Sequence, residues 1–271
     1  MIPLGPYLLD RPIGLGGMGE VWSGRHRDEP VPVAVKLLFK HDTDEDYFQA
    51  QVQNEVRAVA ALDHPGVVRI FDQGRVSAES AGSSRDELVE GTPYMVMELL
   101  TGGTLVPEVG KMDWPRLRHV LLSILGALGH AHAHGVIHRD LKPGNVLLDA
   151  GGSRVVLTDF GLASLAHERD TEDGWVQGTP AYMAPEQVLG IWRDQGPWTD
   201  LYSLGALTWA LAMGLAPFGR DPMKAQERHL NDAPPKLEKS GFPAELDGWV
   251  RRLMSKRPRN RFARAAEAAA A

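Results

Sequence analysis

Several features are missing from this 271-residue sequence, and each absence narrows its chemistry. There are no cysteines, which excludes disulfides, thiolate catalysis and cysteine-based zinc sites. No run approaches the roughly 18 apolar residues of a membrane span, and the N-terminus lacks the pattern of a signal peptide. Acidic residues outnumber basic ones by 35 to 29, which disfavours a nucleic-acid surface as the main function. These absences predict a cytoplasmic protein with no membrane segment and no nucleic-acid partner.

Length and hydrophobic patterning predict the organisation of the chain. A chain of 271 residues exceeds the size at which a single core keeps growing, which favours two lobes. Residues 7–38 carry short apolar runs broken by glycine and proline, the pattern of an antiparallel sheet. Residues 47–62 place apolar side chains three or four apart and predict a helix. Residues 67–71 and 94–100 resemble strands, and the polar stretch 75–91 between them predicts a long mobile surface loop.

From residue 114 onward the sequence becomes mainly helical. The clearest predicted helices are residues 114–133, 200–213 and 244–254. We place the junction at residues 98–103, with a small sheet-rich lobe at residues 1–98 and a larger helical lobe at residues 99–271. A cleft between two lobes is a usual place for a ligand.

A glycine-rich stretch near the N-terminus fits the pattern G-x-G-x-x-G through Gly14, Gly16 and Gly19. A dinucleotide fingerprint needs a helix after these glycines, whereas residues 20–24 have a strand-like pattern. The glycines therefore predict a strand–turn–strand flap whose backbone amides approach a phosphate closely. A glycine-rich hairpin without a ligand is the alternative.

A polar loop at residues 138–145 lies between a predicted buried helix and the apolar run 146–148. Asp140 can accept a proton, Lys142 can meet a transferring phosphate, and Asn145 can offer a carbonyl oxygen to a hard cation. Packed elements on both sides would fix these groups in place. A polar loop with ordinary charges is the alternative for this stretch taken alone.

Three further residues complete the candidate chemistry. Lys36 lies near the end of an apolar strand, and Glu55 lies on the following helix, close enough in the predicted fold to pair with it. Such a pair would hold the ammonium group toward phosphates, although each residue alone is more typical of a solvated surface. Asp159 leaves the apolar strand 155–158 and, with Asn145, supplies oxygen ligands that suit Mg²⁺.

The five motifs in this order resemble the signature of a eukaryotic-type protein kinase domain, especially that of bacterial serine/threonine kinases. They are the glycine loop, the strand lysine, His-Arg-Asp, Asp-Phe-Gly at 159–161 and Ala-Pro-Glu at 184–186. The resemblance covers roughly residues 7–262. It implies an α+β bilobal fold, with a small antiparallel sheet lobe carrying one main helix and a larger helical lobe. It also implies transfer of the γ-phosphate of ATP to Ser/Thr hydroxyls of proteins, including autophosphorylation.

The resemblance assigns phosphate chemistry residue by residue. Lys36 would contact the α- and β-phosphates and pair with Glu55. Asp140 would orient the substrate hydroxyl and accept its proton, and Lys142 would steady the γ-phosphate. The remaining phosphate and metal positions are Gly14, Gly16 and Gly19 over the phosphates, and Asn145 and Asp159 on Mg²⁺, with Mn²⁺ as an alternative cation.

The resemblance also assigns the adenine site and the internal supports. Adenine would lie between Val21, Ala34 and Leu147, beside Met97, and would bond the backbone of Glu98 and Leu100. Lobe alignment would depend on a stack of Val59, Ile70, His138 and Phe160 anchored by Asp200. His138 is then a packing residue rather than an acid or base. Glu186 and Arg261 match a buried ion pair.

The alternating histidines His130, His132 and His134 raise the question of a metal site. Helical neighbours lie three or four residues apart, so side chains two apart point away from each other. The chain has no cysteine to add as a ligand. We therefore predict no metal site at these histidines.

The resemblance also leads to expectations about regulation, binding partners and alternative functions. Thr171 and Thr179 are the candidate phosphosites; phosphate on Thr171 would pair with Arg139, although the acidic residues around Thr171 could satisfy Arg139 instead. Lys142 and Thr179 resemble the serine/threonine pattern rather than the tyrosine-specific one. Protein substrates are the implied partners, and a homodimer could phosphorylate in trans. A catalytically silent pseudokinase and an aminoglycoside-type small-molecule kinase are the alternative functions.

Overall fold

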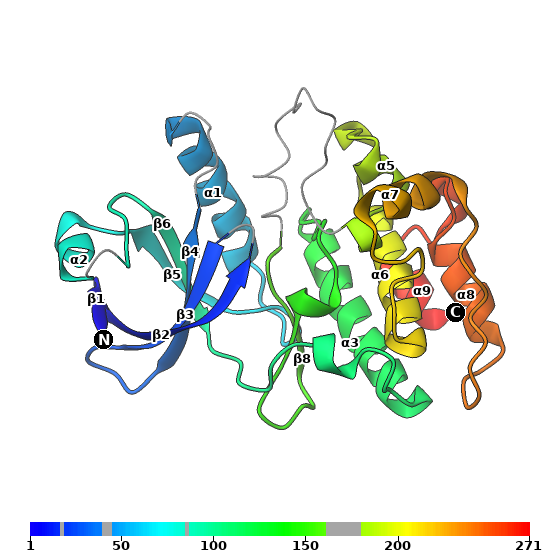
Figure 1. The fold of residues 1–271 in the computed structure, drawn as a ribbon, viewed down its shortest axis with the longest axis horizontal. Helices are drawn as coiled ribbons and strands as arrows, with labels where there is room; N and C mark the ends of the chain where they lie inside the picture. The colour runs from blue at the N-terminus through cyan, green and yellow to red at the C-terminus, as the bar shows by residue number, and fades with distance from the viewer. Residues whose placement is uncertain (17–18, 40–44, 85–86, 161–179) are drawn as a thin grey trace. The chain divides into compact units, whose positions relative to one another are not determined.

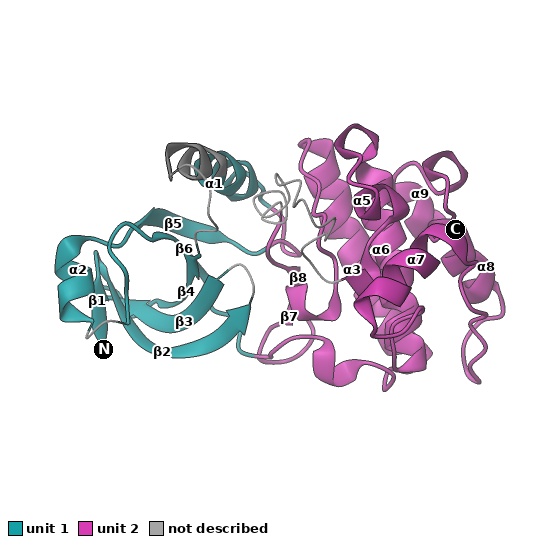
Figure 2. Ribbon diagram, turned by 45° about the horizontal axis from the view of Figure 1, so that its top comes forward, with its two compact units in different colours: residues 1–63, 68–101 teal, residues 64–67, 102–271 magenta. Residues whose placement is uncertain are grey.

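The computed structural model describes residues 1–16, 19–39, 45–84, 87–160 and 180–271. The chain divides into two compact units, coloured separately in Figure 2. Unit 1 comprises Met1–Asp63 and Val68–Thr101, and unit 2 comprises His64–Val67 and Gly102–Ala271. The short segment 64–67 therefore belongs with the second unit although the sequence places it within the first.

Unit 1 is built on an antiparallel sheet with the strand order β1-β2-β3-β4-β6-β5 (Figure 1). Its strands are β1 Ile2–Leu4, β2 Tyr7–Gly16, β3 Gly19–His26, β4 Pro32–Leu38, β5 Ile70–Arg75 and β6 Pro93–Glu98. Every neighbouring pair runs antiparallel, which confirms the predicted sheet type.

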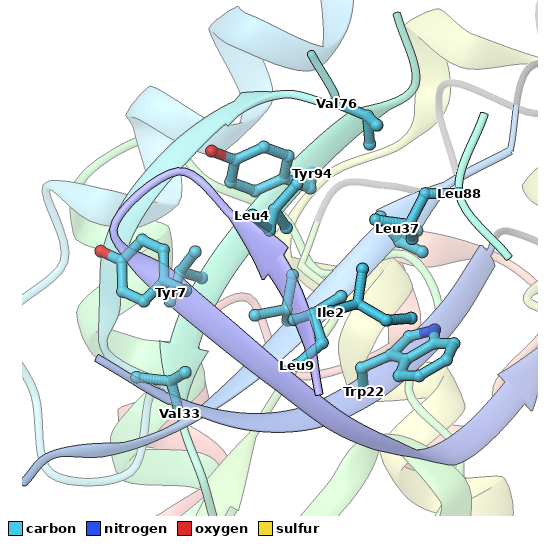
Figure 3. Packing of buried hydrophobic residues seen from close by; sticks show 12 residues of the cluster. Ile2, Leu4, Tyr7, Leu9, Trp22, Val33, Leu37, Val76, Leu88 and Tyr94 are labelled. Carbon is cyan, nitrogen blue, oxygen red and sulfur yellow. The ribbon is translucent and has the colours of Figure 1, made fainter. Parts of the chain in front are cut away.

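One face of this sheet packs on a hydrophobic cluster, shown in Figure 3. Val33, Val35 and Leu37 alternate along β4 and all join the cluster, because side chains two apart on a strand share a face. Leu9 from β2 and Trp22 from β3 lie in the same cluster, and Leu9 is fully buried. The alternate residues of β4 therefore lie on the opposite face of the sheet.

The helix α1 Glu45–Ala60 begins and ends two residues before the predicted 47–62. Its buried side includes Val52, Val56 and Val59, which have the predicted helical spacing. The strand expected at 67–71 is wrong in position, because β5 runs from Ile70 to Arg75. Val67 instead bridges to Leu157 within unit 2.

The loop predicted at residues 75–91 is also wrong, because it contains the helix α2 Ala78–Ser83. The side chain of Ser77 caps this helix by accepting a hydrogen bond from the amide of Ser80 at 3.1 Å. Val76 and Leu88, on either side of α2, are buried in the sheet's hydrophobic cluster. Two apolar anchors within a polar stretch are a weak sequence signal, which explains the error.

Unit 2 is mainly helical, as predicted. Its helices are α3 Trp114–Ala133, α5 Pro185–Val188, α6 Pro197–Met213, α7 Pro222–Asn231, α8 Glu245–Leu253 and α9 Ala265–Ala270. Short 3₁₀ turns are η1 Val106–Glu108, η2 Pro143–Asn145, η3 Pro180–Tyr182, η4 Trp192–Asp194 and η5 Pro258–Asn260. A two-stranded antiparallel ribbon joins β7 Val146–Leu148 to β8 Val155–Leu157.

The helix α6 is the core of unit 2 and is buried along most of its length. A helix that is apolar on all sides is typical of a fully buried element. It begins three residues before the predicted start at residue 200, because Pro197 suits a first helical turn.

The helix α3 occupies the predicted 114–133, and the side chain of Asp113 caps it. None of the described helices is long and apolar enough to cross a membrane.

Candidate active site

In unit 1, the register of the sheet brings four predicted ligand residues to one face. Lys36 lies opposite Val21 on β3, and Ala34 lies opposite Met97 on β6. Directly opposite residues in an antiparallel pair share a face, as do Ala34 and Lys36 two positions apart. This is the face turned away from the hydrophobic cluster. A planar base and an adjacent phosphate chain require this kind of apolar surface beside a cation.

Lys36 is 4% exposed, so its side chain is buried on this face of the sheet rather than extended into open solvent. Glu55 is half-buried on α1, next to the buried Val56. A buried cation in a protein needs a charged or hydrogen-bonding partner. This burial distinguishes Lys36 from the solvated strand end that a lone lysine usually is, and its pairing with Glu55 stays a prediction.

The glycines of the pattern lie on two paired strands. Gly14 pairs with Val21, and Gly16 pairs with Gly19, across β2 and β3. The prediction that a strand follows the glycines is therefore confirmed, and residues 17–18 lie outside the described residues. Gly19 has a φ of 155°, and a Cβ there would lie 1.9 Å from the carbonyl oxygen of Leu37. Close backbone packing alone requires glycine at this position.

The end of β6 carries the predicted adenine-binding backbone. Met97 is buried, and the amide of Glu98 donates to the carbonyl of Arg69 at 3.0 Å. The amide of Arg69 in turn donates to the Glu98 carboxylate at 2.9 Å. Leu100, two residues further on, is half-buried. The two hydrogen bonds with Arg69 fix the backbone of this segment within unit 1.

In unit 2, the polar loop brings its three predicted side chains together. Lys142 Nζ lies 2.7 Å from Asp140 Oδ2. Asn145 Nδ2 donates to the backbone carbonyl of Asp140 at 2.8 Å and to Asp140 Oδ2 at 2.9 Å. The amide nitrogen of Asn145 is thus committed to Asp140, so its carbonyl oxygen is the end suited to a cation. The carboxylate of Asp140 is oriented by one cation and one neutral donor.

Asp159 is placed by the ribbon that follows this loop. Val146 pairs with Leu157, and the amide of Thr158 donates to the carbonyl of Asn145 at 3.0 Å. These bonds put the residues before β7 beside those after β8. Leu147 on β7 is half-buried and bridges to Thr104, and its predicted contact with adenine stays a prediction.

The donor set of Asn145 and Asp159 fits Mg²⁺ by chemistry. One carboxylate and one amide oxygen are hard ligands, and Mg²⁺ usually takes few protein ligands plus water and phosphate oxygens. Among the described residues, no group of three or more His, Cys, Asp or Glu could hold a metal ion. A cation at this pair would take phosphate oxygens and water as further ligands.

Backbone strain in unit 2 coincides with these motifs. Arg139 and Asp159 both have a φ of 64°, and they are the described non-glycine residues with positive φ. Each such residue costs of order 1–3 kcal/mol and persists only where its surroundings fix it. Strained backbone of this kind clusters at functional sites.

The buried Asp200 on α6 supports the strained loop. Its carboxylate accepts hydrogen bonds from the amides of His138 at 2.9 Å and Arg139 at 2.8 Å. It also lies 2.7 Å from His132 Nε2. Burial alone would raise the pKa of Asp200, but the hydrogen bond and charge of His132 and the amide of His138 hold it below its ordinary value. Asp200 thus remains an anionic acceptor for the loop backbone.

The histidines of this region have structural roles. His138 is fully buried with its ring 4.5 Å from that of Phe160, which confirms it as a packing residue, and burial lowers its pKa. His132 contacts Asp200, whereas His130 and His134 face each other at 4.4 Å. Residues two apart on α3 therefore point to different partners, as the helical geometry requires.

A second polar network contacts the loop at residues 138–145. Arg261 and Glu186 form a bidentate ion pair at 2.6 and 2.8 Å, as the resemblance implied. Thr199 donates to the same carboxylate at 2.9 Å, and Gln187 Nε2 donates to the carbonyl of Arg139 at 2.7 Å. The sequence did not indicate Thr199 or Gln187, and the hydrogen bond from Gln187 spans 48 residues and leaves no local pattern.

The structure does not test some of the predicted site residues. Thr171 and Thr179, with Gly161 of the Asp-Phe-Gly motif, lie outside the described residues. Val59 and Ile70 belong to unit 1, and His138 and Phe160 to unit 2, so the four-residue stack stays a prediction.

The sheet-borne lysine and the Asp-Lys-Asn loop are parts typical of a phosphoryl-transfer enzyme. Residues 7–270 match the family model described as the protein kinase domain. The chain therefore belongs to the protein kinase domain family.

Relatives and solved structures agree with this assignment. The chain is 37% identical over 255 residues to the serine/threonine-protein kinase PknA of Mycobacterium tuberculosis, covering 92% of this chain and 56% of PknA. It is 34% identical to the probable serine/threonine-protein kinase PknB of Bifidobacterium longum, covering 97% of this chain and 38% of that protein. The chain thus spans only about half or less of these relatives.

The crystal structure of the Mycobacterium tuberculosis PknI kinase domain matches with a TM-score of 0.73 and 28% identity, covering 99% of this chain and 96% of that one. This likeness confirms the predicted α+β kinase fold, with an antiparallel sheet in one part and helices in the other.

Proposed function

We propose that this chain is an ATP-dependent serine/threonine protein kinase domain, which transfers the γ-phosphate of ATP to Ser/Thr hydroxyls of proteins and to its own. The observation that carries this function is the set of contacts made by Asp140. Its carboxylate is 12% exposed and lies 2.7 Å from Lys142 Nζ and 2.9 Å from Asn145 Nδ2. A carboxylate oriented in this way suits a substrate hydroxyl that must be aimed at phosphorus.

In the proposed reaction, the substrate hydroxyl oxygen forms a bond to the γ-phosphorus as the bond from that phosphorus to the ADP oxygen breaks. Asp140 orients the hydroxyl and accepts its proton. Lys142 neutralises charge on the γ-phosphoryl oxygens. Asn145 and Asp159 would hold Mg²⁺, or Mn²⁺ in its place, which when bound neutralises the charge of the phosphates.

Unit 1 supplies the groups that we assign to the rest of the nucleotide. Lys36, paired with Glu55, would contact the α- and β-phosphates. The backbones of Glu98 and Leu100 would hydrogen-bond adenine. The apolar contacts would come from Val21, Ala34, Met97 and, in unit 2, Leu147, with Gly14, Gly16 and Gly19 over the phosphates. The shared face of Val21, Ala34, Lys36 and Met97 supports this assignment.

The preference for Ser/Thr hydroxyls is inferred from the relatives, and the cellular location is inferred from where ATP is found. The relatives are named serine/threonine kinases, and Lys142 and Thr179 fit that pattern. We assign Thr171 and Thr179 as phosphosites, with a homodimer as the form that phosphorylates in trans. Since the ATP pool lies inside the cell, we place the domain in the cytoplasm.

The decisive experiment incubates the wild type and Asp140→Asn with Mg-ATP and maps phosphosites by mass spectrometry. Loss of a general base and orienting group should lower phosphotransfer by about 10²–10⁴-fold. Asp63→Asn is a matched control, because the Asp63 side chain is 96% exposed, and it should keep wild-type activity. Phosphorylation at Ser and Thr in the wild type supports the proposal.

Two outcomes would contradict the proposed function. Equal, negligible transfer by the wild type and Asp140→Asn would favour a pseudokinase. Transfer to an aminoglycoside but never to protein would favour a small-molecule kinase.

A further inference from the structure

The peptide bond that joins Arg139 to Asp140 is hydrogen-bonded at both of its polar atoms. Its carbonyl oxygen accepts a hydrogen bond from Gln187 Nε2 at 2.7 Å. Its amide donates to His138 Nδ1 at 3.2 Å, and His138 is fully buried. A peptide group is planar, so partners at both its carbonyl and its amide fix the plane from which the next residue extends. The backbone that carries the Asp140 carboxylate is therefore held in one orientation.

This peptide bond follows the strained residue Arg139, whose φ is 64°. A non-glycine residue keeps such a backbone conformation only where its surroundings fix it. The amide of Arg139 donates to the Asp200 carboxylate at 2.8 Å, whereas its carbonyl accepts from Gln187. Asp200 thus holds the backbone on one side of the strained residue, and Gln187 holds it on the side that leads to Asp140.

The side chain of Gln187 on α5 is itself fixed. It is buried, and its Oε1 accepts a hydrogen bond from the amide of Ala184 at 3.0 Å. An amide can only donate and a carbonyl can only accept, so a carboxamide satisfies the Ala184 amide with its oxygen and the Arg139 carbonyl with its nitrogen. The preceding residue, Glu186, forms the buried ion pair with Arg261, which anchors α5. Capping of α5 would account for the first of the two bonds but not for the second.

We propose that Gln187 is a positioning residue for phosphotransfer, which holds the peptide bond before Asp140 and so keeps the Asp140 carboxylate aligned with the substrate hydroxyl. The inference rests on the proposed kinase function, in which Asp140 orients that hydroxyl. Lys142 and Asn145 contact the carboxylate end of this side chain, whereas Gln187 fixes the backbone from which the side chain extends. Phosphotransfer depends on alignment of the reacting groups, so a shift of this backbone should slow the chemical step.

The test measures the single-turnover rate of phosphate transfer from Mg-ATP to dephosphorylated casein, together with the KM for ATP. Gln187→Met keeps the length of the side chain and removes both hydrogen bonds. Gln187→Glu, assayed at pH 8 to favour the ionised form, keeps an acceptor for Ala184 but cannot donate to the carbonyl of Arg139. We expect both variants to lower the single-turnover rate by about 5- to 30-fold, the effect of one buried hydrogen bond, with the KM for ATP within about twofold.

A double-mutant cycle tests whether Gln187 acts through Asp140. In the Asp140→Asn background there is no carboxylate to align, so adding Gln187→Met should change the remaining rate by less than about twofold. General loosening of unit 2 would instead lower the rate by the same factor in both backgrounds.

Thr208→Val is the control for a loss of stability alone. Thr208 is fully buried on α6, and its hydroxyl donates to the carbonyl of Leu204 at 2.7 Å. This variant should unfold at a lower temperature and keep the wild-type single-turnover rate. If Gln187→Met does not fold, Gln187→Asn takes its place, because its amide is one methylene shorter and cannot reach both partners.

The outcomes separate this inference from the proposed function. A wild type that transfers no phosphate to casein or to itself would remove the function on which the inference rests. An active wild type whose rate is matched by Gln187→Glu would overturn the inference alone, because capping of α5 would then be the whole role of the side chain. Equal losses from Gln187→Met with and without the Asp140 carboxylate would also overturn it.

Discussion

The two units hold their candidate functional groups by different physical means. In unit 1, Lys36 and Ala34 are placed by strand register, over a sheet whose other face is an apolar cluster (Figure 3). In unit 2, the loop of Asp140 is placed by hydrogen bonds to buried charged groups, above all Asp200. A sheet distributes its stabilisation over many small contacts, whereas a buried charge concentrates it in a few.

This difference predicts how each unit responds to substitution. Removing apolar volume in unit 1 should lower stability in proportion to the cavity left behind. Removing one partner of a buried ion pair in unit 2 should leave a charge without compensation, which costs more than the pair itself contributes. The three predictions below compare these responses, beginning with the largest.

Arg261→Met should have the largest effect on stability. It leaves the Glu186 side chain, 5% exposed, with Thr199 as its remaining side-chain donor among the described residues. We expect a loss of about 3–5 kcal/mol in the free energy of unfolding, measured by urea denaturation. The double variant Glu186→Met with Arg261→Met should recover part of this loss, because it leaves neither charge of the pair buried without its partner. A loss below about 1 kcal/mol for Arg261→Met would contradict this prediction, because a loss of that size is typical of an exposed ion pair.

Leu9→Ala should have an intermediate effect. Leu9 is fully buried in the cluster of unit 1, and truncating it removes three carbon atoms. A loss of about 3 kcal/mol is expected from transfer and cavity terms together, and Leu9→Val should fall between the variant and the wild type. Leu15→Ala on the same strand is the control, since Leu15 is 78% exposed and should change stability by less than about 0.5 kcal/mol. An equal loss for Leu9→Val and Leu9→Ala would contradict the graded response.

Ser77→Ala should have the smallest effect and tests whether unit 1 also depends on a polar contact. The hydroxyl of Ser77 accepts from the amide of Ser80 at 3.1 Å and caps α2. Its loss should cost about 1 kcal/mol. Ser77→Asp, which keeps a capping oxygen, should match the wild type in denaturant midpoint. If Ser77→Ala equals the wild type, Val76 and Leu88 alone determine the position of α2.

Much of the site could be predicted because its signals are local. The glycines, Lys36, the Asp140 loop and Asp159 each belong to a short motif with fixed spacing, and α3 follows from apolar residues three and four apart. Prediction from local patterns failed where contacts between residues far apart in the sequence determine the structure. The stretch 75–91 is polar in composition, yet Val76 and Leu88 anchor it on the sheet. His132 appeared as one of three alternating histidines, and only packing of α3 against α6 gave it Asp200 as a partner.

By itself, the sequence determined the family, the sheet and helices, and the residues that carry the proposed chemistry, because those depend on residue type and spacing along the chain. The tertiary structure alone decided which side chains share a face and which donors meet which acceptors. The shared face of Val21, Lys36 and Met97 depends on strand register, which places residues tens of positions apart directly opposite one another. The contacts of Tyr202 with Lys256 and with His229 depend on α6, α7 and the segment after α8 packing together in unit 2, and no local pattern in the sequence encodes that meeting.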